Sequence, residues 1–279
     1  MGHRGRTSPV ARRLYALAMT SGFSFEVVNA LDYDELRPSY AHEAVAWVAE
    51  RGSLRDDSVV IDLAAGTGQL SRRFAPLGVD LMAVEPAANM RAVLHERLPT
   101  LRVEDGTAEA MPFAEGSADA VVVGNAFHHF DRPAAFAEIY RALRPGGILA
   151  LFWAWPLEEE QLTIPGMRAI DEVVEATRAS NEIATAYRSW SDVPDDAPGF
   201  GPFERREFPA TNVIPSARLA DLYATSSDVA SLPPEARDPL LGRIRELSRG
   251  LPETLRLPGR TVVDLCVRSE DGADAEKSG

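Results

Sequence analysis

Cysteine and lysine are almost absent from the sequence, which contains one of each, Cys266 and Lys277. One cysteine can form neither an internal disulfide nor a metal site built from several cysteines. Nothing therefore indicates an oxidising compartment, and we expect a cytoplasmic protein. No Gly-Lys-Ser/Thr sequence occurs, which excludes a P-loop. The position of the only lysine, close to the end of the chain, excludes chemistry that uses a buried Schiff-base lysine.

Long apolar runs and an excess of positive charge are missing as well. No run approaches the roughly 18 apolar residues that a membrane span needs. The apolar stretch at residues 14–19 is too short for a signal peptide, and it predicts a short amphipathic helix instead. Acidic residues outnumber basic ones by 42 to 29, which gives a formal net charge of -13. This charge disfavours nucleic acids and anionic membranes as partners.

The sequence itself has the composition of an ordinary globular protein, with 279 residues of which 45% are hydrophobic. Between Val59 and Trp153, short apolar segments alternate with helical stretches. This alternation predicts an α/β fold in which helices cover both faces of a parallel sheet. The expected strands are 59–63, 80–84, 101–103, 118–123 and 148–153, and the expected helices are 68–74, 87–97 and 133–144.

Parallel sheets of this kind bind ligands at the carboxyl ends of their strands. The first strand leads into the segment Asp62-Leu-Ala-Ala-Gly-Thr-Gly68, whose small residues allow close backbone approach. This loop lacks the third glycine of a dinucleotide fingerprint. The carboxylate of Asp62 would repel a pyrophosphate and would suit a cationic ligand. Glu85 follows the second strand, where an acidic residue can accept both hydroxyls of a ribose.

Five segments resemble, in order and spacing, the motifs of class I S-adenosylmethionine-dependent methyltransferases. The resemblance covers roughly residues 38–155 and is closest to the small-molecule branch that includes the quinone C-methyltransferases. It implies a Rossmann-like, seven-stranded, mostly parallel sheet, with an antiparallel pair at 204–211 and 260–267. The matching segments are Asp62–Gly68, Val84–Pro86, Ala108–Phe113, Ala126–Asp131 and Leu143–Gly147.

The resemblance also implies how the chain is organised. We expect an N-terminal helical lid segment at 1–37 and a cofactor-binding core at 38–155. A helical cap or lid at 156–203 would follow, and then the C-terminal part of the core sheet with inserted helices at 204–269. Residues 270–279 are expected to be a disordered tail.

The cofactor implied by the resemblance is S-adenosyl-L-methionine, with S-adenosyl-L-homocysteine as the product. Its implied binding residues are Asp62, Ala64 and Gly66 along the methionine portion, Glu85 at the ribose, Thr107 and Ala108 at the adenine, and Asn125, which would offer a carbonyl to the ammonium group.

The sequence departs from the family pattern at two of these positions. Ala64 replaces the usual first glycine, so the turn must keep a negative φ or carry strain. Thr107 replaces the usual aspartate, and the neighbouring Asp105 is the candidate substitute.

His128 is the candidate catalytic residue, because the family most often places a histidine at this position. Methyl transfer from a sulfonium is an in-line displacement, so catalysis is mostly positioning and exclusion of water. A base is needed only if the acceptor loses a proton. Otherwise His128 would be a wall residue, and Tyr15, Tyr33 and Tyr40 are the next candidates for the base. Two adjacent histidines without a nearby acid make a poor metal site.

Aromatic side chains around the strand ends favour a small hydrophobic substrate, such as an isoprenoid, a polyketide or a quinone-like compound of secondary metabolism. The expected substrate residues are Tyr15, Tyr33, Phe127 and Trp153. The resemblance slightly favours a carbon acceptor over oxygen or nitrogen. Whether copies of the chain form a homo-oligomer is left open by the sequence.

Two other functions remain open at this point. A nicotinamide-dependent oxidoreductase is disfavoured by the missing third glycine and by Asp62. A non-catalytic, methyltransferase-like binding protein is disfavoured because Asp62, Gly66 and Glu85 are all retained. Asp62 could also do no more than cap the helix that follows it.

Overall fold

The computed structural model of the protein describes residues 25–179 and 197–269. These residues divide into two compact units. The helical unit contains residues 25–37, 158–179 and 213–256, and the sheet unit contains 38–157, 197–212 and 257–269. Tyr15, the helix expected at 14–19 and the tail at 270–279 lie outside the described residues.

A seven-stranded sheet forms the framework of the fold, with the strand order β3-β2-β1-β4-β5-β7-β6. Neighbouring strands from β1 to β5 pair in parallel, and β7 pairs antiparallel with β5. The predicted α/β fold with a mostly parallel, seven-stranded sheet is therefore confirmed. The strands are β1 (Val59–Leu63), β2 (Asp80–Val84), β3 (Arg102–Glu104), β4 (Ala118–Gly124), β5 (Leu143–Pro156), β6 (Glu204–Pro215) and β7 (Thr254–Val267).

The α-helices and short 3-10 helices, labelled η, are distributed over both units. In the sheet unit they are α3 (His42–Arg51), α4 (Ser71–Phe74), η2 (Ala75–Leu77), α5 (Ala88–Arg97), η3 (Phe127–His129) and α6 (Arg132–Ala142). In the helical unit they are η1 (Phe25–Val27), α2 (Ala30–Leu36), α7 (Glu158–Gln161), α8 (Met167–Ala179), η4 (Ser216–Arg218), α10 (Leu219–Ala224), α11 (Ser227–Ala230) and α12 (Pro234–Ser248).

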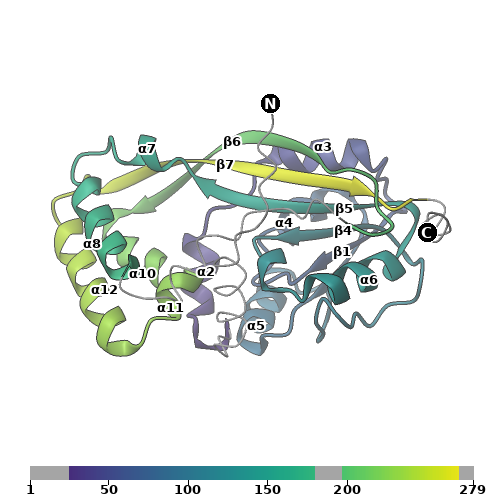
Figure 1. Cartoon of the computed structure of the whole chain (residues 1–279), viewed down its shortest axis with the longest axis horizontal. Helices are drawn as coiled ribbons and strands as arrows, with labels where there is room; N and C mark the ends of the chain where they lie inside the picture. The colour runs from purple at the N-terminus through teal and green to yellow at the C-terminus, as the bar shows by residue number, and fades with distance from the viewer. Residues whose placement is uncertain (1–24, 180–196, 270–279) are drawn as a thin grey trace, which may run out of the picture. The chain divides into compact units, whose positions relative to one another are not determined.

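The core of the sheet unit lies on both faces of the sheet, because successive strand residues point to opposite sides. On one face, Ile61 of β1 belongs to the same buried cluster as Ile139 of α6. On the other face, Val60 of β1 belongs to a cluster with Val48 of α3. Figure 1 shows α3 and α6 on opposite sides of the strands. Burial on both faces explains why the central strands are continuous apolar runs.

The first helix after β1 is shorter than expected. The pattern predicts a helix over 68–74, whereas α4 begins at Ser71. Gly68 has a φ of 85°, which is incompatible with a right-handed helix. A side chain at this position would also meet Leu94, since a built Cβ lies 2.2 Å from its Cδ1 atom. Gly68 therefore belongs to the loop and not to the helix.

The strand order places a switch point between β1 and β4. From β1 the chain continues outward through β2 and β3, whereas β4 is followed by β5 on its other side. The loops that follow β1, β2 and β4 leave the sheet at its carboxyl edge, where sheets of this type bind ligands.

The helical unit is joined by polar contacts between its helices. Arg218 lies at the centre of one group, because its guanidinium contacts Asp32 of α2 at 2.6 Å and Asp221 of α10 at 2.9 Å. The buried face of α8 consists of Met167, Ile170 and Val174. Among the described residues, no helix combines the length and apolarity that crossing a membrane requires.

Candidate functional site

The loop after β1 turns sharply through three residues with a left-handed backbone. Their φ angles are 56° at Ala64, 58° at Gly66 and 85° at Gly68. The amide of Ala65 donates to the carbonyl of Val84 at 3.0 Å, so the loop is attached to the end of β2. The sequence allows either a negative φ or strain at Ala64, and the structure has the positive φ. This conformation is strained, because a side chain disfavours a positive φ.

The variant Ala64→Gly is expected to increase the free energy of unfolding by about 0.5–1 kcal/mol, because glycine adopts this φ without strain. Urea unfolding measures the effect. Ala92→Gly is the control, because Ala92 is exposed in the interior of α5, where φ is negative and glycine is less stable than alanine. A loss of stability in Ala64→Gly as large as that of the control would contradict the strain at Ala64.

Asp62 lies near the end of β1, directly before this loop, and is deeply buried, with an exposed fraction of 1%. Its Oδ2 atom accepts a hydrogen bond from the Ser71 hydroxyl at 2.5 Å. Its Oδ1 atom is buried and has no hydrogen-bond partner within the described ranges. Burial raises the pKa of the carboxyl from 3.8 to about 7, although the Ser71 hydrogen bond opposes the shift. A buried carboxylate oxygen with no partner suits a cationic group of a ligand.

Glu85 follows β2 and faces the same loop. Its Oε2 atom accepts the amide of Gly66 at 2.8 Å, and its Oε1 atom accepts the amide of Ala87 at 2.8 Å. The residue is 5% exposed. A carboxylate has about four acceptor directions, so two amide contacts are compatible with further hydroxyl donors. Asp62, Ala64, Gly66 and Glu85 are thus brought together by β1 and β2.

The segment after β3 contains the two expected adenine residues. Ala108 is buried, whereas Thr107 is exposed and accepts the amide of Ala110 at 3.3 Å. Asp105 is also exposed, and it pairs with the Arg91 guanidinium at 3.0 Å. The same guanidinium donates to the carbonyl oxygens of Glu85 and Pro86. Asp105, the candidate substitute for the aspartate that Thr107 replaces, is therefore part of an ion pair. This ion pair connects the end of β3 to the end of β2.

Asn125 follows β4 in a left-handed conformation, with a φ of 51°. Its amide donates to the carbonyl of Phe152 at 2.8 Å, and its Oδ1 atom accepts the amide of Ala154 at 2.9 Å. The residue is therefore attached to β5 through both its backbone and its side chain. Asparagine tolerates a positive φ better than most residues, which is consistent with its place at this turn.

The two histidines lie in η3, immediately after this turn. The His128 ring stacks on Trp153, with ring centroids 5.9 Å apart and planes 25° from parallel. The His129 ring lies 4.0 Å from that of His128, and burial lowers the pKa of His129 to about 4. His129 is therefore neutral at physiological pH, and it adds no charge beside His128.

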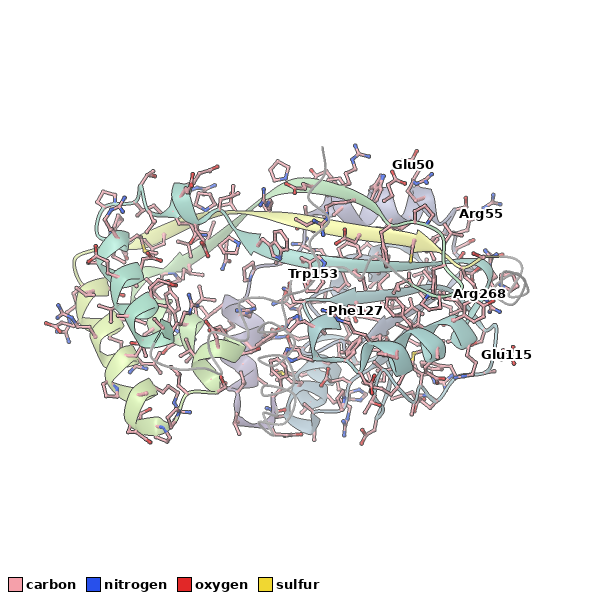
Figure 2. The ribbon with its side chains drawn as sticks, viewed as in Figure 1. Glu50, Arg55, Glu115, Phe127, Trp153 and Arg268 are labelled. Carbon is pink, nitrogen blue, oxygen red and sulfur yellow. The ribbon has the colours of Figure 1, made fainter. Side chains whose placement is uncertain are left out.

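The aromatic residues expected at the substrate are in different surroundings. Phe127 is 1% exposed and packs against Phe136 at a centroid distance of 5.2 Å, and Trp153 is 4% exposed. Figure 2 labels both residues, Phe127 after β4 and Trp153 in β5. Tyr33 belongs to α2 of the helical unit, where its ring lies 6.0 Å from that of Phe25.

Two further residues contact this region: Tyr40, which was one of the candidates for a base, and Asp264, which sequence reasoning missed. The Tyr40 hydroxyl occupies the space of a side chain at Gly124, since a built Cβ lies 2.5 Å from it. Asp264 accepts the indole N–H of Trp153 at 3.2 Å. The sequence does contain a signal for Asp264, because it is an acidic residue inside the apolar run 262–266. No group of three or more potential metal ligands occurs in the part of the chain that the structure describes.

Comparisons with known proteins show the family of the chain. Residues 61–151 match a family model described as a methyltransferase domain. An uncharacterized methyltransferase of Mycobacterium tuberculosis is 33% identical over 239 residues, which cover 85% of this chain and 91% of that protein. A demethylmenaquinone methyltransferase of Renibacterium salmoninarum is 38% identical over 93 residues, which cover 33% of this chain and 39% of that protein.

A solved structure from Anaeromyxobacter dehalogenans, assigned provisionally as a type II methyltransferase, has a similar fold. Its TM-score is 0.61 at 20% sequence identity, and the match covers 84% of this chain and 98% of that chain.

Proposed function

The chain belongs to the class I S-adenosylmethionine-dependent methyltransferases, and we propose that it methylates a small hydrophobic metabolite. The observation that carries the proposed cofactor site is the buried Oδ1 atom of Asp62, which has no hydrogen-bond partner in the described residues and lies directly before a loop attached to Glu85. The proposed binding residues are Asp62, Ala64, Gly66, Glu85, Thr107, Ala108 and Asn125.

The residues of this loop suit S-adenosylmethionine chemically. The buried Asp62 carboxylate would pair with a positive charge of the ligand, and Glu85 would accept ribose hydroxyls. The ligand carries no phosphate that these two carboxylates would repel. When bound, S-adenosylmethionine supplies a methyl group attached to a positively charged sulfur.

The chain's contribution to the reaction is mainly one of placement. The turn at Ala64 and Gly66 would let the backbone approach the ligand closely, and Glu85 joins this turn to the end of β2. Placement of two reactants in line lowers the entropic part of the barrier, and exclusion of water strengthens the electrostatic contacts. His128 would accept a proton from an acceptor that must lose one.

Two observations support the proposed acceptor class. One relative, which is 38% identical to this chain over 93 residues, is named a demethylmenaquinone methyltransferase. Aromatic side chains, among them Phe127, Phe130 and Trp153, gather after β4 and at the end of β5. A hydrophobic acceptor of the isoprenoid, polyketide or quinone-like kind fits these observations, with carbon slightly favoured as the acceptor atom.

Calorimetric titration tests the cofactor site directly. We expect S-adenosylhomocysteine and S-adenosylmethionine to bind, and NADH to show no heat of binding. Tight binding of NADH without binding of S-adenosylmethionine would refute the proposal. Incubation with methyl-labelled cofactor and a panel of hydrophobic acceptors (quinols, polyprenols and polyketides) and polar ones (amino acids and sugars) then tests the acceptor class. Label found only in polar acceptors would refute the hydrophobic class.

His128→Ala is expected to lower turnover by about 100-fold if the acceptor loses a proton, which is the lower end of the range for a general base. The affinity for S-adenosylhomocysteine should stay within about twofold, because His128 is not among the proposed cofactor residues. His95→Ala is the control, since His95 is exposed on α5. Wild-type turnover in His128→Ala would leave this histidine as a wall residue.

A further inference from the structure

We propose that Asp264 and Arg205 are positioning residues that hold the Trp153 indole and, through it, orient the His128 ring. The inference rests on the proposed function only in taking His128 as a residue of the reaction site. The contacts involved join β6, β7 and β5 to the segment that follows β4.

Asp264 is an unusual residue for its place in the sheet. It lies in β7 opposite Leu151 of β5, and its exposed fraction is 2%. Val262 and Cys266 lie two residues to either side on the same strand, and both belong to the apolar cluster on one face of the sheet. A carboxylate in such surroundings is costly unless hydrogen bonds and a charge partner compensate for its desolvation.

The carboxylate of Asp264 has such partners on both sides. Arg205 of β6 contacts it with two nitrogens, Nε to Oδ1 at 2.7 Å and Nη2 to Oδ2 at 3.0 Å. The indole Nε1 of Trp153 donates to Oδ2 at 3.2 Å. A bidentate guanidinium fixes the plane of the carboxylate, because two parallel hydrogen bonds allow little rotation. The indole N–H therefore has an acceptor in a defined position.

The orientation of Trp153 in turn determines what His128 contacts. The two rings are 5.9 Å apart and 25° from parallel, so His128 lies against an indole whose edge is anchored at Asp264. Rotation of the indole would remove the flat surface on which the imidazole stacks. The second tryptophan of this strand, Trp155, has the guanidinium groups of Arg205 and Arg260 at 5.9 and 5.7 Å from its ring centroid. Arg205 thus contacts this aromatic strand end as well as Asp264.

Stability alone does not account for Asp264. Replacing a buried ion pair with apolar side chains is often neutral or stabilising, and apolar residues already occupy the neighbouring positions of this face. What an apolar residue at 264 could not do is accept the indole N–H. The carboxylate is therefore best explained by the orientation that it imposes on Trp153.

The test is the NMR chemical shift of the His128 ring protons, which the ring current of Trp153 displaces. Trp153→Leu defines the shift without the indole, and His128→Gln assigns the resonances. Asp264→Leu is expected to move the His128 resonances at least halfway towards their Trp153→Leu positions, and Asp264→Asn to move them less, in the same direction. Glu207→Gln is the control, since Glu207 forms an exposed ion pair with Arg260, and it should leave them unchanged.

His128 resonances that stay at their wild-type positions in folded Asp264→Leu would overturn the proposal. If that variant does not fold, Asp264→Ala decides, because alanine also lacks an acceptor for the indole N–H, and unmoved resonances there have the same meaning. The affinity for S-adenosylhomocysteine should remain within twofold in both variants. A chain that binds no S-adenosylhomocysteine would refute the proposed function, whereas the ring-proton shifts would still report whether Asp264 orients the two rings.

Discussion

Asp62→Asn is expected to weaken binding of S-adenosylmethionine and at the same time to stabilise the cofactor-free protein at pH 8. Burial raises the pKa of Asp62 from 3.8 to about 7, so the fold favours the protonated carboxyl. Between these two values the folded state binds more protons than the unfolded state, and stability falls as the pH rises. Above pH 7 the full penalty is present, and asparagine would remove a cost on the order of 4 kcal/mol.

Denaturant unfolding of both proteins at pH 5 and pH 8 measures this effect. The wild-type protein should lose stability between these pH values relative to Asp62→Asn, because only the wild-type protein has this titrating group. Asp57→Asn is the control, since Asp57 is exposed just before β1. A variant that is less stable than the wild type at pH 8 would contradict the cost assigned to the buried charge.

The same titration predicts how cofactor affinity depends on pH. A cationic ligand binds the ionised carboxylate, so the affinity of the wild-type protein should increase as the pH rises through about 7. Asp62→Asn should bind weakly at every pH and lack this dependence. Calorimetry from pH 5.5 to 8.5 checks both statements, and a pH-dependent affinity that persists in the variant would assign the titration to another group.

Glu85→Ala is expected to weaken cofactor binding by about 2 kcal/mol, which corresponds to roughly 30-fold in Kd. The variant removes the proposed ribose acceptor, and it also leaves the amides of Gly66 and Ala87 without their carboxylate partner. Glu85→Gln retains one carbonyl oxygen and should have an intermediate effect. Calorimetry with S-adenosylhomocysteine makes the comparison, with Glu96→Ala on the exposed face of α5 as the control.

Adenosine distinguishes the roles of the two acids, because it contains the ribose and lacks the amino-acid portion. Glu85→Ala should weaken adenosine binding, whereas Asp62→Asn should leave it nearly unchanged. Equal losses in the two variants would mean that the loop has been disrupted as a whole. Unchanged binding of both ligands to Glu85→Ala would refute the ribose assignment.

The strands of the sheet were predictable because their signal is local. β1 and β2 have the predicted bounds, since strands buried on both faces must be continuous apolar runs. The last strand was less predictable: residues 260–267 were expected, and β7 begins at Thr254. Its first part, Thr254-Leu-Arg-Leu-Pro-Gly, contains a proline and a glycine, which normally mark turns.

The backbone of the site could be predicted only in part. The sequence indicated that Ala64 needs either a negative φ or strain, and it could not choose, because the choice depends on how the loop meets the end of β2. Asp105 lies two residues from Thr107 in the chain, yet its carboxylate pairs with Arg91 of α5. A contact of this kind follows from the packing of α5 beside β3, which no local pattern encodes.

The sequence by itself determined the fold class, the order of the strands along the chain and the positions of Asp62 and Glu85 at strand ends. These features follow from apolar periodicity and from short motifs, which lie within a few residues of one another. Only the tertiary structure decided that Asp62 has a buried oxygen without a partner, and that Asp264 reaches Trp153 across 111 residues of sequence. Burial and pairing between distant residues depend on which strands become neighbours, and that is settled only when the whole sheet forms.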